Sequence, residues 1–149
     1  MVTIYAMCGA PGSGKSYYGK KFAAENHYYY ISSDELRNLL FGSENVQARP
    51  DKVFRFMDSL VESCINWDVS VVYDSTLSKL KDRKSFIEKF SDKADLVLIY
   101  MQTSLEECIR RNNARDRVVE QKVIEKHFNR LKMNAPSLDE GWKEIIYVK

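Results

Sequence analysis

The stretch YAMCGAPGSGKSYYGKKF, residues 5–22, runs from apolar residues into glycines, a lysine and a serine, and then into an amphipathic segment. Its central part, GAPGSGKS at residues 9–16, fits the pattern GxxxxGK[ST] between a predicted strand and a predicted helix. Glycines let the backbone wrap closely around phosphates, and a helix N-terminus adds partial positive charge there. The stretch therefore predicts a loop that binds the phosphates of a nucleotide. A glycine turn formed by chance is the alternative.

Each part of this loop has an expected role. Lys15 bridges the outer phosphates of the donor nucleotide, and Ser16 holds Mg²⁺. The residues predicted to bind the donor nucleotide are Gly9, Ala10, Pro11, Gly12, Ser13, Gly14, Lys15, Ser16 and Tyr17. Tyr17 is at the margin of this set, because its spacing places it outside the phosphate contacts.

The rest of the sequence favours ATP, or a similar nucleoside triphosphate, as the phosphate donor. There is no NKxD motif of the kind that reads guanine. With 149 residues, the chain is also short for a GTPase and for an AAA motor that carries a second, helical subdomain. We therefore expect ATP and Mg²⁺ as cofactors.

The composition indicates one soluble globular domain. Hydrophobic residues make up 44% of the chain and charged residues 30%, and 149 residues are enough to bury a single core. No repeat, low-complexity tract or linker divides the sequence, so residues 1–149 are predicted to form one domain. The formal net charge of +2 is too small to indicate nucleic-acid binding by itself.

The cysteines and the apolar runs bear on the cellular compartment. Cys8, Cys64 and Cys108 are odd in number, far apart and without a CxxC pair. They are predicted to be reduced core residues of a cytoplasmic protein, not disulfide partners or zinc ligands. No segment approaches the roughly 18 apolar residues of a membrane span, so no membrane partner is expected.

Short apolar runs alternate with amphipathic segments along the whole chain, which predicts an α/β fold with a mostly parallel sheet. The predicted strands are residues 3–7, 28–32, 70–74, 95–101 and 144–148. The predicted helices lie near residues 15–25, 34–41, 51–67, 79–90, 104–113 and 120–133. Residues 42–50, GSENVQARP, are polar and end in proline, so they are predicted to form a surface loop.

A carboxylate and an arginine follow the second predicted strand. Ser32 and Glu35 have the spacing of a capping box, so a helix should begin near Ser33 and place Asp34 in its first turn. Arg37, three residues further on, projects from the same side. A carboxylate beside a phosphate site can deprotonate an acceptor hydroxyl, and the arginine can hold an anion on that acceptor. Ordinary helix-start chemistry, with Asp34 and Arg37 as a surface pair, is the alternative.

Four motifs together resemble the P-loop kinases of the phage polynucleotide kinase group, which includes zeta-toxin-like and other small phosphotransferases. They are the glycine loop, ISSDELR at residues 31–37, SVVYDSTLSKLKDRKSFI at residues 70–87, and CIRRNNARDRVVEQKVI at residues 108–124. The resemblance covers roughly residues 2–131. It implies a three-layer P-loop kinase fold with a five-stranded sheet flanked by helices and an arginine-rich lid at about residues 110–120.

The resemblance also implies roles for single residues. Asp34 resembles the general base that acts on the acceptor 5′-hydroxyl, and Arg37 the arginine that contacts the neighbouring acceptor phosphate. Arg115 falls where the lid places the arginine that stabilises the transferring phosphoryl group. Arg111 matches a lid position near the base of the donor nucleotide. Lys15, Asp34 and Arg115 are therefore the expected catalytic residues, although the arginines in this segment, including Arg110 and Arg117, could also be solvated.

Asp74 ends the third predicted strand, next to the phosphate loop. It is expected to orient Mg²⁺-bound water or the acceptor, so Ser16 and Asp74 are the predicted metal ligands. A strand-end cap is the alternative. The family usually has a small hydroxyl residue and often asparagine after this aspartate, whereas here the run is DSTL, so Thr76 departs from the pattern. The predicted acceptor contacts are Asp34, Arg37, Asp74 and Ser75.

Basic and aromatic residues could line a groove for nucleic acid. The basic candidates are Arg49, Lys52, Arg55, Lys79, Lys81, Arg83 and Lys84, for which solvated helix faces are the alternative. Tyr28, Tyr29 and Tyr30 could stack on bases, with core packing as the alternative. Phe54, Met57, Leu60, Val61 and Cys64 recur at helical spacing and are expected in the core.

Three functions are compatible with these motifs. The first is a kinase that transfers the γ-phosphate of ATP to the 5′-hydroxyl of a polynucleotide, either DNA or RNA. The second is a kinase for a small-molecule acceptor such as a nucleoside, a sugar or an antibiotic. The third is a non-catalytic nucleotide-binding module. No DxDxT phosphatase or KxDG ligase motif is present, and the sequence leaves the oligomeric state open.

Overall fold

The protein alternates strands and helices, as the hydrophobic pattern predicts. Its computed structural model describes residues 1–44, 46–115 and 118–149. The strands are β1 (Thr3–Cys8), β2 (Tyr29–Ser32), β3 (Val71–Asp74), β4 (Asp95–Met101) and β5 (Glu144–Val148). The helices are α1 (Lys15–Asn26), α2 (Ser33–Phe41), α3 (Pro50–Asn66), α4 (Leu80–Phe90), α5 (Leu105–Asn113), α6 (Gln121–Met133) and the short η1 (Leu138–Glu140). The α/β fold class and the predicted elements are confirmed.

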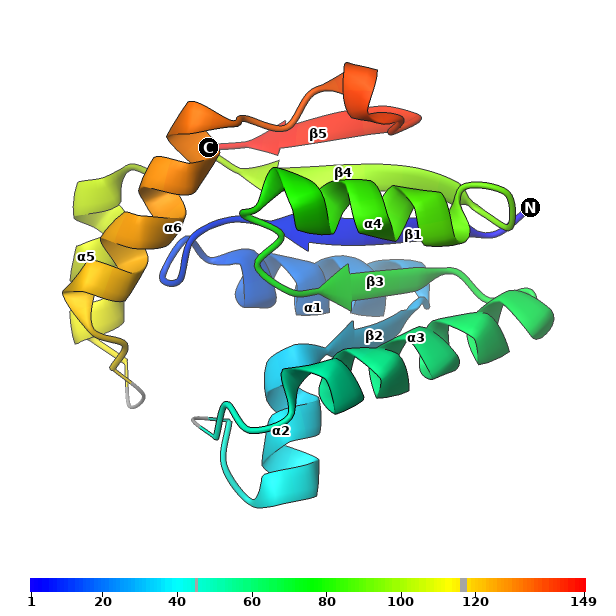
Figure 1. Ribbon diagram of the computed structural model, residues 1–149, viewed down its shortest axis with the longest axis horizontal. Helices are drawn as coiled ribbons and strands as arrows, with labels where there is room; N and C mark the ends of the chain where they lie inside the picture. Colours follow the sequence, from blue (N-terminus) through cyan, green and yellow to red (C-terminus); the bar gives the residue numbers. More distant parts are fainter. Residues whose placement is uncertain (45, 116–117) are drawn as a thin grey trace.

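The strands form one sheet in the order β2-β3-β1-β4-β5, and every neighbouring pair is parallel. All strands therefore end at the same edge, on the left in Figure 1, where α2, α5 and α6 gather. In the paired register, Met7 of β1 and Ser32 of β2 both lie opposite Asp74 of β3. The phosphate loop after β1 and the start of α2 after β2 thus meet beside Asp74, which is the usual place for a ligand in an open parallel sheet.

Helices cover both faces of the sheet, which gives the three layers expected (Figure 1). One face packs against α3 and α4 through a large apolar cluster that includes Val53, Met57 and Phe90. The opposite face packs against α1, with Ala23 buried against the sheet. The strands are apolar on both sides because both faces are covered.

The start of α2 is set by side-chain capping, as the sequence predicts. Ser32 is the N-cap residue, and its hydroxyl accepts a hydrogen bond from the Glu35 backbone N–H at 3.3 Å. The first turn contains Asp34, where the helix dipole favours a negative charge. The cap therefore fixes the position of Asp34 relative to the end of β2.

Arg83 of α4 is a structural residue, so its prediction as a nucleic-acid contact is wrong. Its side chain is fully buried and forms two hydrogen bonds with the Glu140 carboxylate, at 2.9 and 3.0 Å. It also donates to the carbonyls of Leu77 and Asn134. A buried charge needs such partners, and these contacts join the loop after β3 to the segment before β5.

The three cysteines are buried free thiols, as predicted. Burial raises the pKa of Cys8 to about 12, so this thiol stays protonated at neutral pH. Among the described residues, no helix has the length and apolar character needed to span a membrane.

Candidate active site

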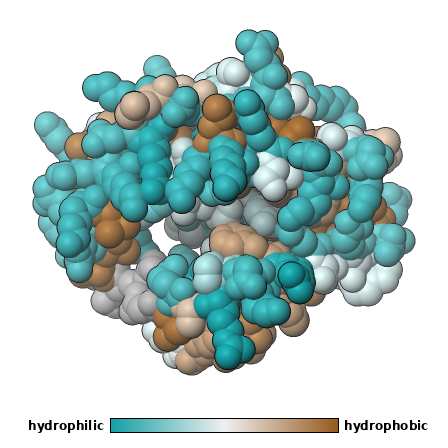
Figure 2. Space-filling model, viewed as in Figure 1, coloured by the Kyte–Doolittle hydropathy of each residue, from teal (hydrophilic) through white to brown (hydrophobic). Residues whose placement is uncertain are grey.

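A cleft of about 1350 Å³ lies at the carboxyl edge of the sheet. Figure 2 shows the surface hollowed there, with hydrophilic residues around much of the opening. Most predicted site residues line this cleft: Pro11, Gly12, Gly14, Lys15, Ser16, Tyr17, Asp34, Arg37, Ser75, Arg111 and Arg115. Four predicted site residues are not among the residues that line the cleft: Gly9, Ala10, Ser13 and Asp74. The structure therefore brings the predicted donor and acceptor residues to one cavity.

The phosphate loop depends on two glycines with positive φ. Gly12 has φ 82° and Gly14 has φ 90°, a conformation that favours glycine. A Cβ atom on Gly12 would lie only 2.3 Å from the carbonyl oxygen of Cys108 on α5. Gly14 is the N-cap residue of α1, so the loop leads directly into a helix N-terminus that favours anions.

The loop is also held from the α5 side by hydrogen bonds to its backbone. The carbonyl of Ser13 accepts one bond from Thr103 Oγ1 at 2.7 Å and another from Arg111 Nη1 at 3.0 Å. Arg111 also pairs with Glu107, at 3.0 Å. Arg111 thus lies against the phosphate loop, at the rim of the cleft.

The other arginines of this segment differ in their surroundings. Arg110 is on the surface and pairs with Glu107, so it fits the solvated interpretation. The hydrogen bonds from Arg110 first, and then from Arg111, lower the pKa of Glu107 to about 2. Arg115 is exposed and lines the cleft. Arg117 lies outside the described residues.

Asp74 is the centre of a buried polar network. It is 2% exposed, and its Oδ2 atom accepts hydrogen bonds from Ser16 Oγ at 2.7 Å and from the Tyr30 hydroxyl. Its Oδ1 atom lies 3.3 Å from Lys15 Nζ. The carboxylate thus joins the two functional side chains of the phosphate loop, and a simple strand-end cap does not describe it.

Tyr30 belongs to this network, although its sequence context favoured core packing. Burial, followed by the nearby Asp74 carboxylate, raises the pKa of the Tyr30 hydroxyl, so Tyr30 remains a hydrogen-bond donor. Its ring lies against Gly19 of α1, where a Cβ atom would come within 3.3 Å of Tyr30 Cε1. The sequence alone could not reveal this contact, because it depends on the pairing of Ser32 with Asp74, on the face of β2 that Tyr30 shares with Ser32.

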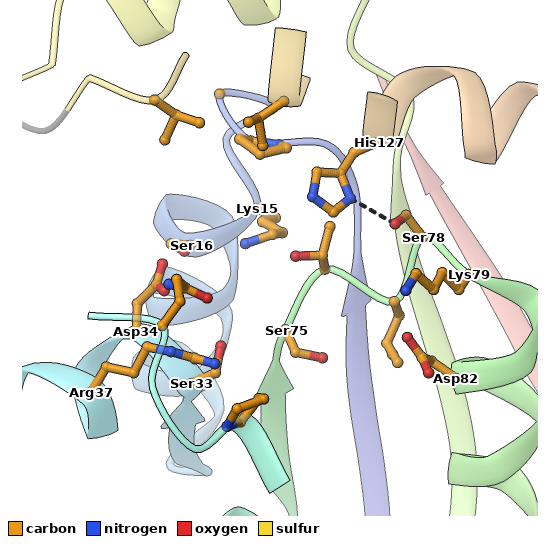
Figure 3. A pocket seen from close by; sticks show the side chains of 18 of the residues that line it. Lys15, Ser16, Ser33, Asp34, Arg37, Ser75, Ser78, Lys79, Asp82 and His127 are labelled. Carbon is orange, nitrogen blue, oxygen red and sulfur yellow. Dashed lines mark hydrogen bonds between the residues drawn. The ribbon is translucent and has the colours of Figure 1, made fainter. Parts of the chain in front are cut away.

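Asp34 and Arg37 line the wall opposite α6 (Figure 3). Asp34 is partly buried, whereas Arg37 is only 4% exposed and its guanidinium lies 5.7 Å from the ring centroid of Phe54 on α3. A cation over an aromatic face is favourable. The surface-pair interpretation therefore fails for Arg37. Phe54, expected in the core, is partly buried and lines the cleft next to it.

The loop between β3 and α4, residues 75–79, forms part of the cleft wall and is anchored to other elements. The Thr76 carbonyl accepts a hydrogen bond from the Gly9 N–H at 3.3 Å, and the Leu77 carbonyl accepts one from Arg83 at 3.0 Å. Leu77 has φ 48°, a left-handed conformation that costs energy for leucine and persists only where neighbouring contacts fix it. These contacts hold Ser75 and Ser78 in place at the cleft.

His127 of α6 is a cleft residue that the sequence did not indicate. Its Nδ1 atom forms a hydrogen bond of 2.7 Å with Ser78 Oγ, which joins α6 to the loop of residues 75–79 (Figure 3). Burial, followed by the nearby cations, lowers the pKa of His127 to about 4, so the ring is neutral at pH 7. A single histidine in an amphipathic helix carries no motif that could have revealed this contact.

The predicted groove residues are mostly outside the cleft. Of the basic candidates, Lys79 lines it; Arg49, Lys52, Arg55, Lys81 and Lys84 are exposed and are not among its lining residues. Tyr28 stacks on Tyr5 with ring centroids 5.4 Å apart, and Tyr29 is 51% exposed at the sheet edge. The tyrosines therefore do not form a base-stacking surface in the cleft.

The sequence profile of the AAA domain family matches residues 4–138, most of the chain. The chain belongs to the AAA domain family. No curated protein matches the sequence of this AAA domain.

Solved structures show that this AAA domain has the P-loop kinase fold. A chain of the Pnkp1/Rnl/Hen1 RNA repair complex superposes with a TM-score of 0.81 at 21% identity, covering 89% of this chain and 44% of that chain. A gluconokinase from Sinorhizobium meliloti 1021 superposes with a TM-score of 0.64 at 19% identity, covering 98% of this chain and 81% of that chain. Shikimate kinase from Acinetobacter baumannii, in complex with shikimate, superposes with a TM-score of 0.61 at 18% identity, covering 100% of this chain and 84% of that chain. The AAA domain thus spans less than half of the RNA-repair chain that it matches.

Proposed function

We propose that this protein is an ATP-dependent kinase that transfers the γ-phosphate to the 5′-hydroxyl of a polynucleotide. The observation that carries the proposal is that Lys15 and Ser16 of a phosphate loop share one cleft with Asp34 and Arg37 of α2. A nucleotide-binding module needs only the loop, whereas phosphoryl transfer needs an acceptor side as well. Membership of the phage polynucleotide kinase and zeta-toxin-like group, and a cytoplasmic location, are parts of the same proposal.

In the proposed reaction, Lys15 holds the outer phosphates and Arg111 stays at the rim near the donor base. Asp34 accepts the proton of the acceptor hydroxyl while the hydroxyl oxygen forms a bond to the γ-phosphorus. The bond from the γ-phosphorus to the bridging oxygen breaks, and ADP leaves. Arg115 stabilises the negative charge on the transferring group from a lid formed by residues around 110–120.

The residues beside Lys15 fit a magnesium ion. Ser16 Oγ and the Asp74 carboxylate are hard oxygen ligands that already lie 2.7 Å apart. The buried Asp74 Oδ1 atom accepts no hydrogen bond from the described residues. When bound, Mg²⁺ would neutralise charge on the β- and γ-phosphates. Tyr30 holds Asp74 in place for this task.

The size of the cleft and its arginine support a nucleotide acceptor. Small-molecule pockets usually measure roughly 300–1,000 Å³, whereas this cleft of about 1350 Å³ has space for a donor nucleotide and a second nucleotide. Arg37 offers a fixed guanidinium, which matches the phosphate that follows a 5′-terminal nucleoside. Ser75 is positioned to contact the same acceptor.

The part of the cleft formed by α3 and α4 favours a second candidate, a kinase for a hydroxyl-rich small molecule. Asp58, Asp82 and Lys89 line this part, and Lys89 pairs with Asp58. Carboxylates there would repel a polyanion but can accept hydrogen bonds from sugar hydroxyls.

The test uses labelled ATP and Mg²⁺ with 5′-hydroxyl DNA and RNA oligonucleotides, and in parallel with a panel of nucleosides, sugars and hydroxy acids. Labelled oligonucleotide is the expected product. Label on a small molecule alone would replace the polynucleotide proposal with the second candidate. If no acceptor is labelled but ATP still raises the melting temperature, the protein is a binding module.

A further inference from the structure

His127 is a chemically active side chain that the proposed reaction does not use. Its ring lines the same part of the cleft as Lys15, and its Nδ1 atom is engaged by Ser78 (Figure 3). The second ring nitrogen, Nε2, lies on the side of the ring away from Ser78. One nitrogen therefore fixes the ring, and the other is left for a ligand.

The hydrogen bond between Ser78 and Nδ1 connects the tautomer of His127 to the direction of the Ser78 hydroxyl. Ser78 is only 3% exposed and belongs to the anchored loop of residues 75–79, so its hydroxyl is held in place. If this hydroxyl donates to Nδ1, the proton of the neutral imidazole is on Nε2. Nε2–H is then a hydrogen-bond donor, as is the Lys15 ammonium group that lines the same cleft. This tautomer matches a cleft built for an anion.

The charged groups near His127 also favour an anion as the ligand of this part of the cleft. Lys15 at the start of α1, Lys79 before α4, and Lys126 and Arg130 on α6 itself all oppose its protonation. Among the described residues, the charged groups with the largest effects on the ring are these four cations. Burial adds to their effect. A phosphate bound among these cations would reverse the local balance of charge and favour the imidazolium form.

We propose that His127 donates its Nε2–H to the γ-phosphate of the bound nucleotide and takes up one proton from solvent when that phosphate binds. The inference rests on the proposed nucleotide-binding function, and adds to it a contact and a coupling to pH. Between the pKa of His127 in the free protein and its higher pKa in the nucleotide complex, only the complex holds the extra proton. Within this range, nucleotide affinity increases as the pH falls. When the γ-phosphate has been transferred and the products leave, His127 returns the proton to solvent.

The sign of the pH effect follows from linkage. In the free protein His127 has a pKa of about 4, and the bound phosphate raises it. Above the raised pKa neither state holds the proton, and the affinity does not depend on His127. Below that value, and down to pH 4, the affinity gains up to about tenfold per pH unit. The titration of ATP itself contributes equally to every variant and cancels when variants are compared.

Two substitutions of His127 separate its role as a hydrogen-bond donor from its ability to take up a proton. His127→Asn keeps a partner for Ser78 near the Nδ1 position but removes the donor in the cleft. His127→Gln places an amide N–H near the Nε2 position but cannot take up a proton. The chain contains two histidines, and His27 is exposed at the end of α1 with φ 57°, which asparagine tolerates. His27→Asn is therefore a matched control.

The experiment measures binding of ATP with Mg²⁺ by calorimetry at pH 6 and pH 8, each in two buffers with different ionisation enthalpies. The wild type and His27→Asn should take up more protons at pH 6 than either His127 variant. His127→Asn should bind ATP about tenfold more weakly than the wild type at pH 8, because it lacks a hydrogen bond to a charged group. His127→Gln should stay close to wild-type affinity at pH 8 but lose the gain at pH 6.

Imidazole NMR of the intact protein gives a readout that a purely structural role would not move. The His27→Asn spectrum assigns the two histidine signals, and the His127 signal is then titrated alone, with ADP and with ATP, always with Mg²⁺. ATP should raise the His127 midpoint from about 4 to about 6 or above, and ADP should raise it by less. If ATP binds and the midpoint does not move, or if ADP shifts it equally, the proposal is wrong while nucleotide binding stands. If ATP does not bind the wild type at all, both proposals fall.

Discussion

The proposed donor side and the proposed acceptor side of the cleft are built differently. On the donor side, the phosphate loop is held through its backbone, because the Ser13 carbonyl accepts two hydrogen bonds and Gly12 packs directly on a carbonyl of α5. On the acceptor side, α2 and α3 present side chains, with Arg37 lying over Phe54. Residues 42–44 and 46–49, which join these two helices, have irregular backbone. The shape of the phosphate loop thus depends on backbone contacts, whereas the proposed acceptor side depends on a few side chains of α2 and α3.

Asp34→Ala should have the largest effect and be confined to the acceptor side. We expect kcat to fall by about 10³-fold, because a general base contributes on the order of 10² to 10⁴, while ATP affinity stays unchanged. Single-turnover assays and ATP calorimetry measure the two quantities. Glu35→Ala, one residue further on and exposed on the surface, is the control and should keep full activity. Full activity of Asp34→Ala would remove it as the base.

Gly12→Ala tests the backbone of the donor side. A methyl group there would meet the Cys108 carbonyl at 2.3 Å, so the loop or α5 must move. We expect the free energy of unfolding to fall by about 2–4 kcal/mol and ATP affinity by roughly tenfold or more.

Gly42→Ala is the matched control for Gly12→Ala. Gly42 has a similar φ of 77°, but a Cβ atom would meet nothing within 4 Å. It should cost only the backbone strain, about 1 kcal/mol, and leave ATP binding intact. Equal losses in the two variants would mean that the contact with α5 is unimportant for the loop.

Tyr30→Phe should have a smaller effect, specific to the metal. It removes the hydroxyl that donates to Asp74 and keeps the ring against Gly19. A lost hydrogen bond is worth about 0.5–1.5 kcal/mol, so the Mg²⁺ concentration for half-maximal ATP binding should rise by about three- to tenfold. Mg²⁺ titrations of ATP binding measure this directly. Tyr29→Phe, at the exposed sheet edge, should not change it, and an equal response of both variants would contradict the role of Tyr30.

A further effect concerns the stability of the protein in acid. Since the pKa of His127 is lowered from 6.5 to about 4 in the folded protein, protonation opposes folding. The contribution of His127 is complete above pH 6.5 and is lost as the pH falls from 6.5 to about 4. With a discount for the exposed part of the ring, the loss is about 1–2 kcal/mol. Urea unfolding without nucleotide should show it in the wild type and not in His127→Gln; the same slope in both would assign the loss to other groups.

Local sequence patterns predicted the helices, the strands and the position of the glycine-rich loop well. Strand and helix periodicity located the elements, the glycine spacing located the phosphate loop, and Ser32 with Glu35 located the start of α2. These features depend on residues close together in the chain. Asp34 and Arg37 could be found for the same reason, because one helix turn carries both.

The contacts that could not be predicted from the sequence are those between segments far apart in the chain. Tyr30 meets Asp74 only through the register of β2 on β3, and His127 meets Ser78 only when α6 closes over the loop after β3. In the sequence, Arg83 is typical of a residue on the exposed face of a helix. Only its ion pair with Glu140 in the structure shows why it is buried. Single residues of this kind carry no spacing signal, so their roles depend on tertiary packing.

The central position of β1 has a consequence for the order of folding. Ile4 of β1 pairs with Val71 on one side and Leu96 on the other, so this strand is held by partners made much later during synthesis. Contacts between segments so far apart in sequence close large loops and form slowly. The phosphate loop, which follows β1, therefore emerges from the ribosome before β3 and β4 and reaches its final shape only after both have paired with β1. Chains that stop before residue 95 should not bind ATP in an equilibrium assay, and only a chain with both neighbours of β1 in place should be stabilised by the nucleotide.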